Sequence, residues 1–261
     1  MLILVVGFGL RLWLHQIELA NQSVVSNQPQ TSTKVTADIV PDPLTEAVSD
    51  QNTPLIPDQP EPVKEEKPTT VQWDAPFTTQ APRTNWDAFH EEMCEEASLL
   101  IADEWYQGAT RTKIPIDEAE TRLTAMAVWE REALGTDVST TIQQMAQTAT
   151  GYLNIPADRV TVTEVKSIDE LRELVRKGVV VAPFAGRLLG NPHYTGEGPR
   201  YHASVIIGFD ERQFVVHDVG TRHGADYQYK NTVLWTALHD YVAEPADITT
   251  GSKTVLLLTR P

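Results

Sequence analysis

The chain has one cysteine among its 261 residues, so it has no internal disulfide and no CxxC metal-binding motif. A single thiol is then either a small core side chain or a reagent. Basic residues are also scarce, because 21 Lys and Arg stand against 36 Asp and Glu, which gives a net charge of -15. That charge repels nucleic-acid phosphates and anionic membrane surfaces, so we expect no nucleic acid among the partners.

Aromatic residues are absent from residues 21–72, where Pro, Gln, Thr, Ser and acidic residues dominate. Such a composition has too few large apolar side chains to offset the conformational entropy lost on folding. We therefore interpret residues 21–72 as a disordered, extended stalk. Aromatic residues resume at Trp73, which places the folded domain at residues 73–261.

The first 20 residues are unusually apolar and begin MLILVVGFGLRLWL. This run has the length of a signal-peptide core and is shorter than the roughly 20 apolar residues of a spanning helix. Arg11 interrupts it, and no basic residue precedes it. We interpret residues 1–20 as a signal-anchor-like segment, with a buried strand or helix as the alternative. The protein is then exported, and it is either tethered to the membrane through this segment only or secreted.

Helical patterns precede strand patterns in the domain, which indicates an α+β fold. Three helices are expected first, then a strand, a further helix and four more strands. They are expected at residues 86–108, 116–135, 138–154, 159–165, 167–178, 179–184, 201–209, 213–219 and 253–260. The Ser167–Glu170 pair predicts a capping box, and a late helix is expected around His239. The Gly- and Pro-rich loop at 185–200 is long enough to shape a cleft.

The lone Cys94 lies near the start of the first predicted helix, on a stripe with Ala97, Ile101 and Trp105. A helix N-terminus lowers a thiol pKa and so favours the nucleophilic thiolate. The neighbouring glutamates oppose this effect, but their helical spacing from Cys94 predicts that they face water. The four are Glu91, Glu92, Glu95 and Glu96.

A histidine and an aspartate are predicted to meet on a β-hairpin. His202 lies at the start of one strand and Asp218 at the end of the returning strand. Asp218 can orient the imidazole and stabilise its charged form. The two side chains share a face only if the turn has an odd number of residues or a β-bulge intervenes. A two-residue turn at Asp210 and Glu211 would separate them.

An oxyanion that forms during acyl transfer needs hydrogen-bond donors. Gln80 lies in a proline-bracketed loop, 14 residues before Cys94 in the sequence. Its amide and the backbone N–H of Cys94 form a candidate oxyanion hole.

The order of Gln80, Cys94, His202 and Asp218, with the words PFTTQAP, NWD, CEEASLL, YHASVIIGFD and FVVHDVG, resembles the papain-like cysteine peptidases of family thirty-nine, and most closely their stand-alone bacterial branch. The resemblance covers residues 75–261. It implies a papain-like fold in which a central Cys-bearing helix packs on a twisted antiparallel sheet. It also implies peptide or protein substrates and no cofactor.

By that resemblance Cys94 is the nucleophile, His202 the base and acid, Asp218 the orienting acid and Gln80 the oxyanion donor. Family members commonly carry Gly before the cysteine and Gly-Pro after it, where this chain has Met93 and Glu95-Glu96, and often Pro after the aspartate, where Val219 stands. These departures bear on substrate preference. Trp86, Tyr201 and the loop from Arg187 to Arg200 are candidate substrate walls. We expect alkylation of Cys94 to be fast near pH 6, as for a thiolate paired with an imidazolium.

Three alternatives compete with a peptidase. His90 and Cys94 are spaced as zinc ligands on a helix, and His202, His217 or Asp218 could complete a zinc site; we expect no metal, because His90 is equally explained as a surface residue of the first turn. The second alternative is a catalytically silent binding module in which Cys94 only packs. The third is a related chemistry, either acyl transfer to an amine or hydrolysis of cell-wall peptides.

Overall fold

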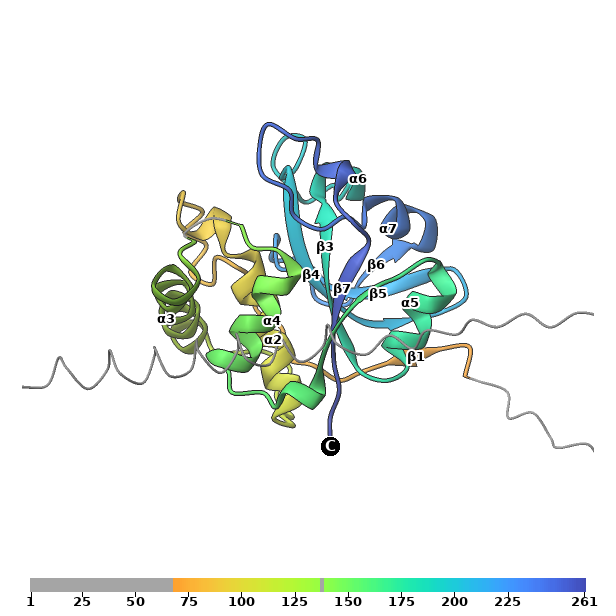
Figure 1. The fold of residues 1–261 in the computed structure, drawn as a ribbon, viewed down its shortest axis with the longest axis horizontal. Helices are drawn as coiled ribbons and strands as arrows, with labels where there is room; N and C mark the ends of the chain where they lie inside the picture. Colours follow the sequence, from red (N-terminus) through yellow and green to blue (C-terminus); the bar gives the residue numbers. More distant parts are fainter. Residues whose placement is uncertain (1–67, 137–138) are drawn as a thin grey trace, which may run out of the picture. The chain divides into compact units, whose positions relative to one another are not determined.

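The computed structural model describes residues 68–136 and 139–261 of the chain. The predictions for residues 1–20 and 21–67 lie outside the described residues. Within the described ranges, no helix has both the length and the apolar character that a membrane crossing requires. Helices come before most of the strands, as predicted, and the fold is α+β (Figure 1).

A seven-stranded antiparallel sheet forms the centre of the domain, in the order β2-β7-β3-β4-β5-β6, with β1 paired to β4. The strands are β1 Val71–Gln72, β2 Val160–Glu164, β3 Val179–Ala185, β4 Tyr201–Phe209, β5 Gln213–His217, β6 Tyr227–Lys230 and β7 Thr254–Leu258. Strand pairing therefore begins at Val71, just before the boundary placed at Trp73.

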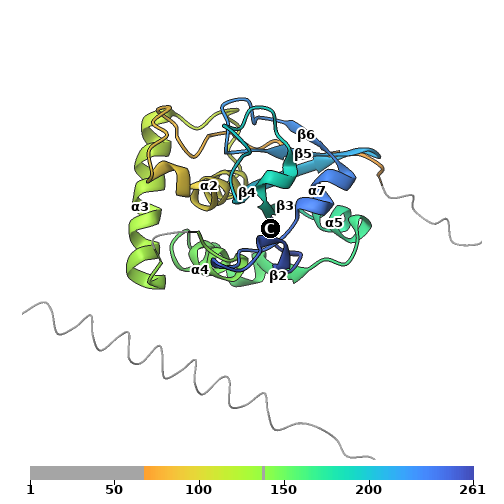
Figure 2. The same cartoon turned by 90° about the horizontal axis from the view of Figure 1, so that it is seen from above.

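Helices cover both faces of this sheet (Figures 1 and 2). The first face carries α2 Cys94–Tyr106, α3 Ile116–Leu134 and α4 Ile142–Gly151, and the second carries α5 Ile168–Val175, α6 Gly186–Leu189 and α7 Asn231–Ala237. Single turns of 3-10 helix lie at η1 His90–Glu92, η2 Ala157–Arg159 and η3 Ile248–Thr250.

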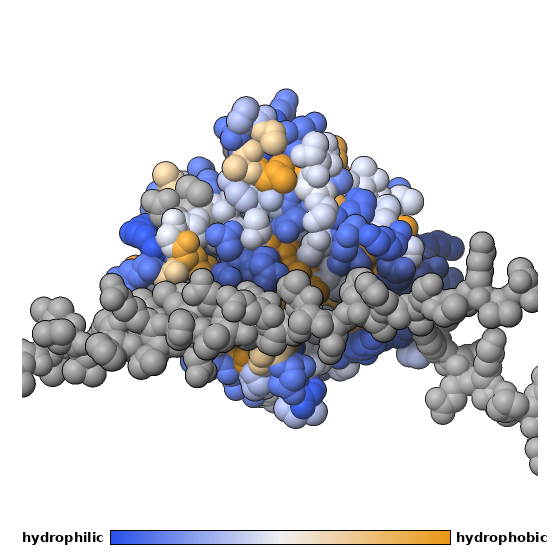
Figure 3. Space-filling view, viewed as in Figure 1, coloured by the Kyte–Doolittle hydropathy of each residue, from blue (hydrophilic) through white to orange (hydrophobic). Residues whose placement is uncertain are grey.

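Alternate residues of the central strands enter two separate cores. Val179 and Val181 of β3 pack with α2 and α4, whereas Val180 and Ala182 pack with α5 and α7. Successive side chains of a strand point to opposite faces, so a strand buried on both sides is apolar throughout. This explains the uninterrupted apolar runs of the sequence. On the outside, the visible face is mostly hydrophilic, with apolar residues in small separate groups (Figure 3).

Most predicted elements are present, with local differences. Gly135 follows α3 in the left-handed conformation at φ 70°, as a helix-ending glycine does. Ser167 accepts a hydrogen bond from the Glu170 N–H, but the Glu170 carboxylate accepts from Lys166, so only half of the capping box forms. Strands β1 and β6 and helix α6 were not predicted from the sequence. The late helix is α7, and it ends at Ala237, so the placement of His239 in it was wrong.

The prediction that the glutamates around Cys94 face water was wrong for two of them. Glu91 and Glu92 are exposed, but Glu95 and Glu96 are only 1% and 7% exposed. The reason is that α2 is covered on every side, because it lies between α3, α4 and strands β3 and β4. Residues that point away from Cys94 on such a helix therefore enter another buried environment.

Three carboxyl groups are consequently buried near one another between α2 and α3. Burial raises the pKa of Glu95 to about 7. Burial, with the charges of Glu130 and Glu95, raises the pKa of Glu96 well above its usual range, and burial also raises that of Glu130. An ionised carboxylate in this position is costly unless it is paired. The folded protein therefore keeps protons on these carboxyl groups at pH values at which the unfolded chain has released them.

We expect the buried pair of Glu96 and Glu130 to make stability fall as pH rises. A carboxyl with a raised pKa in the folded state keeps a proton that the unfolded chain releases above about pH 4.5, so the folded state loses stability above that pH. Glu96→Gln removes this titration. The variant should lose less free energy of unfolding than the wild type between pH 5.5 and 8.5, by about 2 kcal/mol, in urea denaturation.

Glu132→Gln is the matched control, because Glu132 lies on α3 but is exposed. It should follow the wild-type pH dependence. Equal pH dependence in Glu96→Gln and Glu132→Gln would contradict the assignment of a retained proton to the buried pair.

Candidate active site

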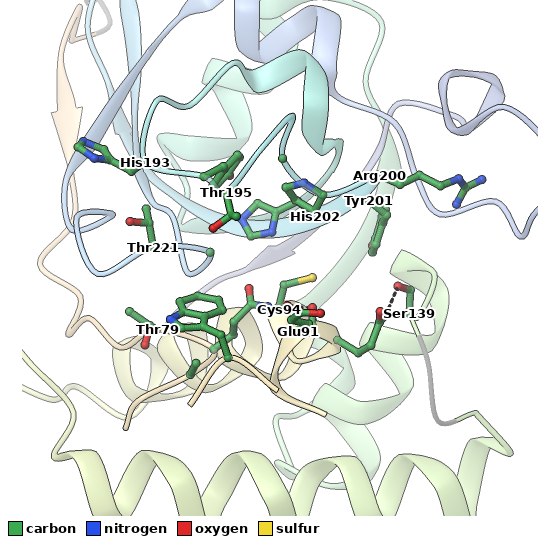
Figure 4. A pocket seen from close by; sticks show the side chains of 18 of the residues that line it. Thr79, Glu91, Cys94, Ser139, His193, Thr195, Arg200, Tyr201, His202 and Thr221 are labelled. Atoms are coloured by element: carbon green, nitrogen blue, oxygen red, sulfur yellow. Dashed lines mark hydrogen bonds between the residues drawn. The ribbon is translucent and has the colours of Figure 1, made fainter. Parts of the chain in front are cut away.

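The sulfur of Cys94 lies against strand β4. Cys94 is the first residue of α2, and its Sγ accepts a hydrogen bond from the backbone N–H of Ala203 at 3.3 Å. Ala203 directly follows His202, so the helix and the sheet bring the thiol against the backbone of the strand that carries the predicted base, although 109 positions separate Cys94 from Ala203. Figure 4 shows Cys94 and His202 on facing walls of one pocket.

The imidazole of His202 is fixed by Asp218. Its Nε2 lies 2.8 Å from Oδ1 of Asp218 and 3.0 Å from the hydroxyl of Ser204. The ring of Tyr194 packs against it edge to face, with centroids 5.5 Å apart. A β-carbon on Gly220 would lie 2.8 Å from Cε1 of His202, so only glycine lets the chain pass this close to the ring.

A β-bulge places His202 and Asp218 on the same face of the sheet. Phe209 pairs with Phe214 at the turn, but after an irregularity between Ile206 and Gly208 the register changes so that Val205 pairs with His217. Without that extra residue, Asp218 would point to the face opposite His202. Of the two conditions derived from the sequence, the bulge is the one that this hairpin satisfies.

The carboxylate of Asp218 accepts five hydrogen bonds in a fully buried position. Oδ1 accepts from His202 and from the Gly220 N–H, and Oδ2 accepts from Asn191, Tyr194 and Tyr229 at 2.9, 2.7 and 2.5 Å. Burial raises the pKa of Asp218, but the charge of His202 and these hydrogen bonds outweigh it and lower the pKa to about 2. Asp218 is therefore an anion at any physiological pH.

Gln80 lies beside the nucleophile, but its amide is already engaged. Its Nε2 donates to the backbone oxygens of His90 and Glu91, both at 2.9 Å, and its Oε1 is buried without a hydrogen-bond partner. The backbone N–H of Gln80 donates to Val219, which ties the loop to the end of β5. The structure confirms that Gln80 lines the pocket with Cys94 but shows both amide hydrogens directed at backbone carbonyls.

A carboxylate holds the thiol on its other side. Sγ of Cys94 donates to Oε2 of Glu95 at 2.9 Å, and Oε1 of Glu95 accepts from the Thr140 N–H at 2.6 Å. Burial, followed by the charge and hydrogen bond of Glu95, raises the pKa of the Cys94 thiol well above its usual value. The position at the helix start does not outweigh these effects. This shift is opposite in direction to the one expected from the helix start.

Cys94 and His202 open into a cleft of about 1130 Å³. Both predicted wall aromatics line it: Trp86 is 43% exposed, whereas Tyr201 is buried and donates its hydroxyl proton to the Thr140 carbonyl. The predicted loop contributes residues from its second half, His193–Tyr194–Thr195 and Gly198–Pro199–Arg200, but not Arg187. A groove of this size accommodates several residues of an extended peptide.

The structure separates the candidate zinc ligands. His90 is buried, not a surface residue, and its ring contacts Asp87 at 2.7 Å and Glu120 at 3.0 Å. His217 bonds instead to the Ala75 carbonyl and the Asp226 N–H. In the part of the chain that the structure describes, no three His, Cys, Asp or Glu side chains cluster as metal ligands would.

Several site residues had no signal in the sequence. Asn191 and Tyr194, which hold Asp218, come from the loop predicted to shape a cleft, and Tyr229 comes from β6, which was not predicted. Glu95 was noticed but was assigned to the solvent.

The cleft thus presents a thiol and an imidazole, and a buried carboxylate contacts that imidazole. The sequence model of the Peptidase_C39 like family matches residues 68–243, which is more than half of the chain. The chain belongs to this family, and it is a cysteine peptidase by class.

Two solved structures are similar to the chain. A Bacillus anthracis protein described as a C39-like peptidase has 18% identity and a TM-score of 0.46, covering 73% of this chain and 98% of its own. The Carica candamarcensis cysteine protease CMS1MS2, solved in complex with E-64, has 12% identity and a TM-score of 0.42, covering 74% and 99%. No curated protein matches the chain.

We expect the hydroxyl of Tyr229 to stabilise the fold through Asp218. Tyr229→Phe removes one buried hydrogen bond to a charged acceptor, and the free energy of unfolding should fall by about 2 kcal/mol at pH 7 in urea denaturation. Tyr227→Phe is the control, since Tyr227 lies on the same strand but its hydroxyl makes no hydrogen bond to Asp218. Equal losses in the two variants would contradict this role.

Proposed function

We propose that the domain hydrolyses peptide bonds with Cys94 as nucleophile, His202 as general base and acid, and Asp218 as the group that orients the imidazole and stabilises its charged form. The observation that carries the proposal is the hydrogen bond from Ala203 to the Cys94 sulfur, which puts the thiol at the strand residue that follows His202. The His202–Asp218 contact of 2.8 Å supports the role of Asp218.

The reaction begins with transfer of the thiol proton to His202. Because Nε2 faces Asp218, Nδ1 is the nitrogen that takes this proton. The sulfur then forms a bond to the substrate carbonyl carbon, and the carbonyl oxygen becomes an oxyanion. When the tetrahedral intermediate collapses, the carbon–nitrogen bond breaks and His202 gives the proton to the leaving amine. Water, deprotonated by His202, then attacks the thioester carbon. The carbon–sulfur bond breaks, the acid is released, and the proton on His202 returns to the sulfur.

The oxyanion is held by backbone and side-chain donors near Cys94. As the first residue of α2, Cys94 has an N–H with no carbonyl partner inside the helix. Gln80 becomes the second donor by exchanging its bond to the Glu91 carbonyl for a bond to the oxyanion. Since one hydrogen bond is lost for each gained, Gln80 contributes less than a preformed donor would.

Substitutions should reduce peptidase activity in a graded manner. With a fluorogenic peptide library and labelled casein as substrates, Cys94→Ala should abolish turnover, and His202→Ala should reduce kcat/KM by about a thousandfold or more. Gln80→Ala should reduce it by about tenfold because the Cys94 N–H remains. His239→Gln is the control, since His239 bonds the Gly251 carbonyl outside the cleft lining. Full activity in a folded Cys94→Ala variant would rule out this mechanism.

We also propose that the peptidase acts outside the bacterial cytoplasm. The support is the sequence alone: an apolar segment at residues 1–20 and a Pro-, Thr- and acid-rich segment at 21–72 precede the domain. In this arrangement the stalk separates the cleft from the membrane surface and leaves it accessible to peptides or proteins.

Fractionation of bacteria that express the full chain tests this location. The full chain should be found in the membrane fraction and be degraded by protease added to spheroplasts, or it should be found in the medium if the segment is cleaved. A chain lacking residues 1–20 should remain inside the cell. Protection of the full chain from external protease, with none of it in the medium, would contradict export.

A further inference from the structure

The residue after the nucleophile has a carboxyl group in contact with the thiol. Oε2 of Glu95 accepts the Cys94 S–H hydrogen bond at 2.9 Å, and Glu95 is 1% exposed. The mechanism derived above does not use this group. An acidic side chain this close to a buried sulfur must change how the thiol ionises, because their interaction is poorly screened.

The Glu95 carboxyl is also held by the backbone at Thr140, just before α4. Its other oxygen accepts from the Thr140 N–H at 2.6 Å, and the Thr140 carbonyl accepts from the Tyr201 hydroxyl at 3.0 Å. Tyr201 belongs to β4 and immediately precedes His202. The acceptor for the thiol proton is therefore part of a hydrogen-bonded chain that joins α2 to the strand that carries the base.

The ionisable groups that act on the thiol directly are acidic. They are Glu95 and Glu96 on α2, and Glu130 on α3 acts in turn on both of them. His202 on β4 lines the same cleft, and the other lining residues that can carry a positive charge are His193, Arg200, Arg222 and His223. With Glu95 ionised, a thiolate at Cys94 would still be in direct contact with an anion.

We propose that Glu95 is a positioning residue that holds Cys94 as a protonated thiol in the resting enzyme, so that the proton passes to His202 only as a substrate carbonyl engages the sulfur. This inference rests on the proposed function. Before substrate binds, S–H donates to Glu95 and the imidazole is neutral. During attack, the same proton moves to Nδ1 of His202, and the forming carbon–sulfur bond removes the charge that Glu95 opposes.

The test is the pH dependence of Cys94 alkylation by iodoacetamide, which follows the thiolate fraction. The single cysteine makes the measured rate specific to this site. Glu95→Gln keeps an oxygen to accept from Thr140 but removes the negative charge beside the sulfur. The variant should react at least tenfold faster than the wild type at pH 8.5, where Glu95 with its pKa of about 7 is ionised in the wild type, and the midpoint of its rate profile should lie at least one pH unit lower.

Glu96→Gln is the matched control, because it makes the same change one residue along the same helix, at another buried carboxyl. Its midpoint should move less than that of Glu95→Gln, since Glu96 has a weaker influence on the thiol and makes no hydrogen bond to it. Identical profiles for the wild type and Glu95→Gln, or equal shifts in the two variants, would overturn the proposal.

A measurement on the wild type keeps the proposal testable if Glu95→Gln does not fold. The infrared S–H stretching band belongs to Cys94 alone, so it should persist at pH 8 and be displaced to lower frequency by the hydrogen bond to Glu95. Absence of the band at pH 8 would show a resting thiolate and overturn the proposal. Neither readout requires turnover: peptidase activity that survives Cys94→Ala refutes the proposed function, whereas the alkylation and infrared results judge the role of Glu95.

Discussion

The site depends on one contact between layers of the fold, the packing of the first turn of α2 against strand β4. Cys94 is presented at the helix start, and its sulfur meets the Ala203 amide on the strand that carries His202. Both elements are buried on every side, so neither can move without disturbing a core. The reacting groups therefore lie on rigid elements, while the loop before β4 contributes to the cleft lining and, through Asn191 and Tyr194, to the bonds that hold Asp218.

Asp218 is the second fixed point, and its environment explains its chemistry. Donors from the 191–194 loop, from β6 and from the backbone at Gly220 converge on one carboxylate. A buried anion is stable only when such partners replace its water. The same hydrogen bonds fix the ring plane of His202. The orientation of the imidazole and the ionisation of the carboxylate therefore depend on the same contacts. The β-bulge is what makes this possible, because it decides which face of β5 meets the imidazole.

The helices, the main strands and the order of site residues could be predicted from periodicity, caps and family resemblance, because these depend on local patterns. The surroundings of α2 could not. Helical spacing gives the angle between the Cys94 and Glu95 side chains, but it does not say which neighbouring elements lie in each direction. A helix that is covered on every side is therefore predicted to have one exposed face. Likewise, the alternation of side chains along a strand gives the condition under which His202 and Asp218 meet. It does not show that a bulge is present, because a bulge has no clear sequence signal. The engagement of Gln80 by two backbone carbonyls depends on contacts made only after folding.

The hydrogen bond from Cys94 to Glu95 also bears on how long such an enzyme survives. Peroxides and other oxidants attack the thiolate and convert it stepwise to sulfenic and then irreversible sulfinic acid. A chain with one cysteine has no second thiol to trap the sulfenic acid as an internal disulfide and so permit its repair. A sulfur that stays protonated between encounters with substrate is oxidised more slowly. The enzyme then stays active for longer, but nucleophilic attack on the substrate is slower.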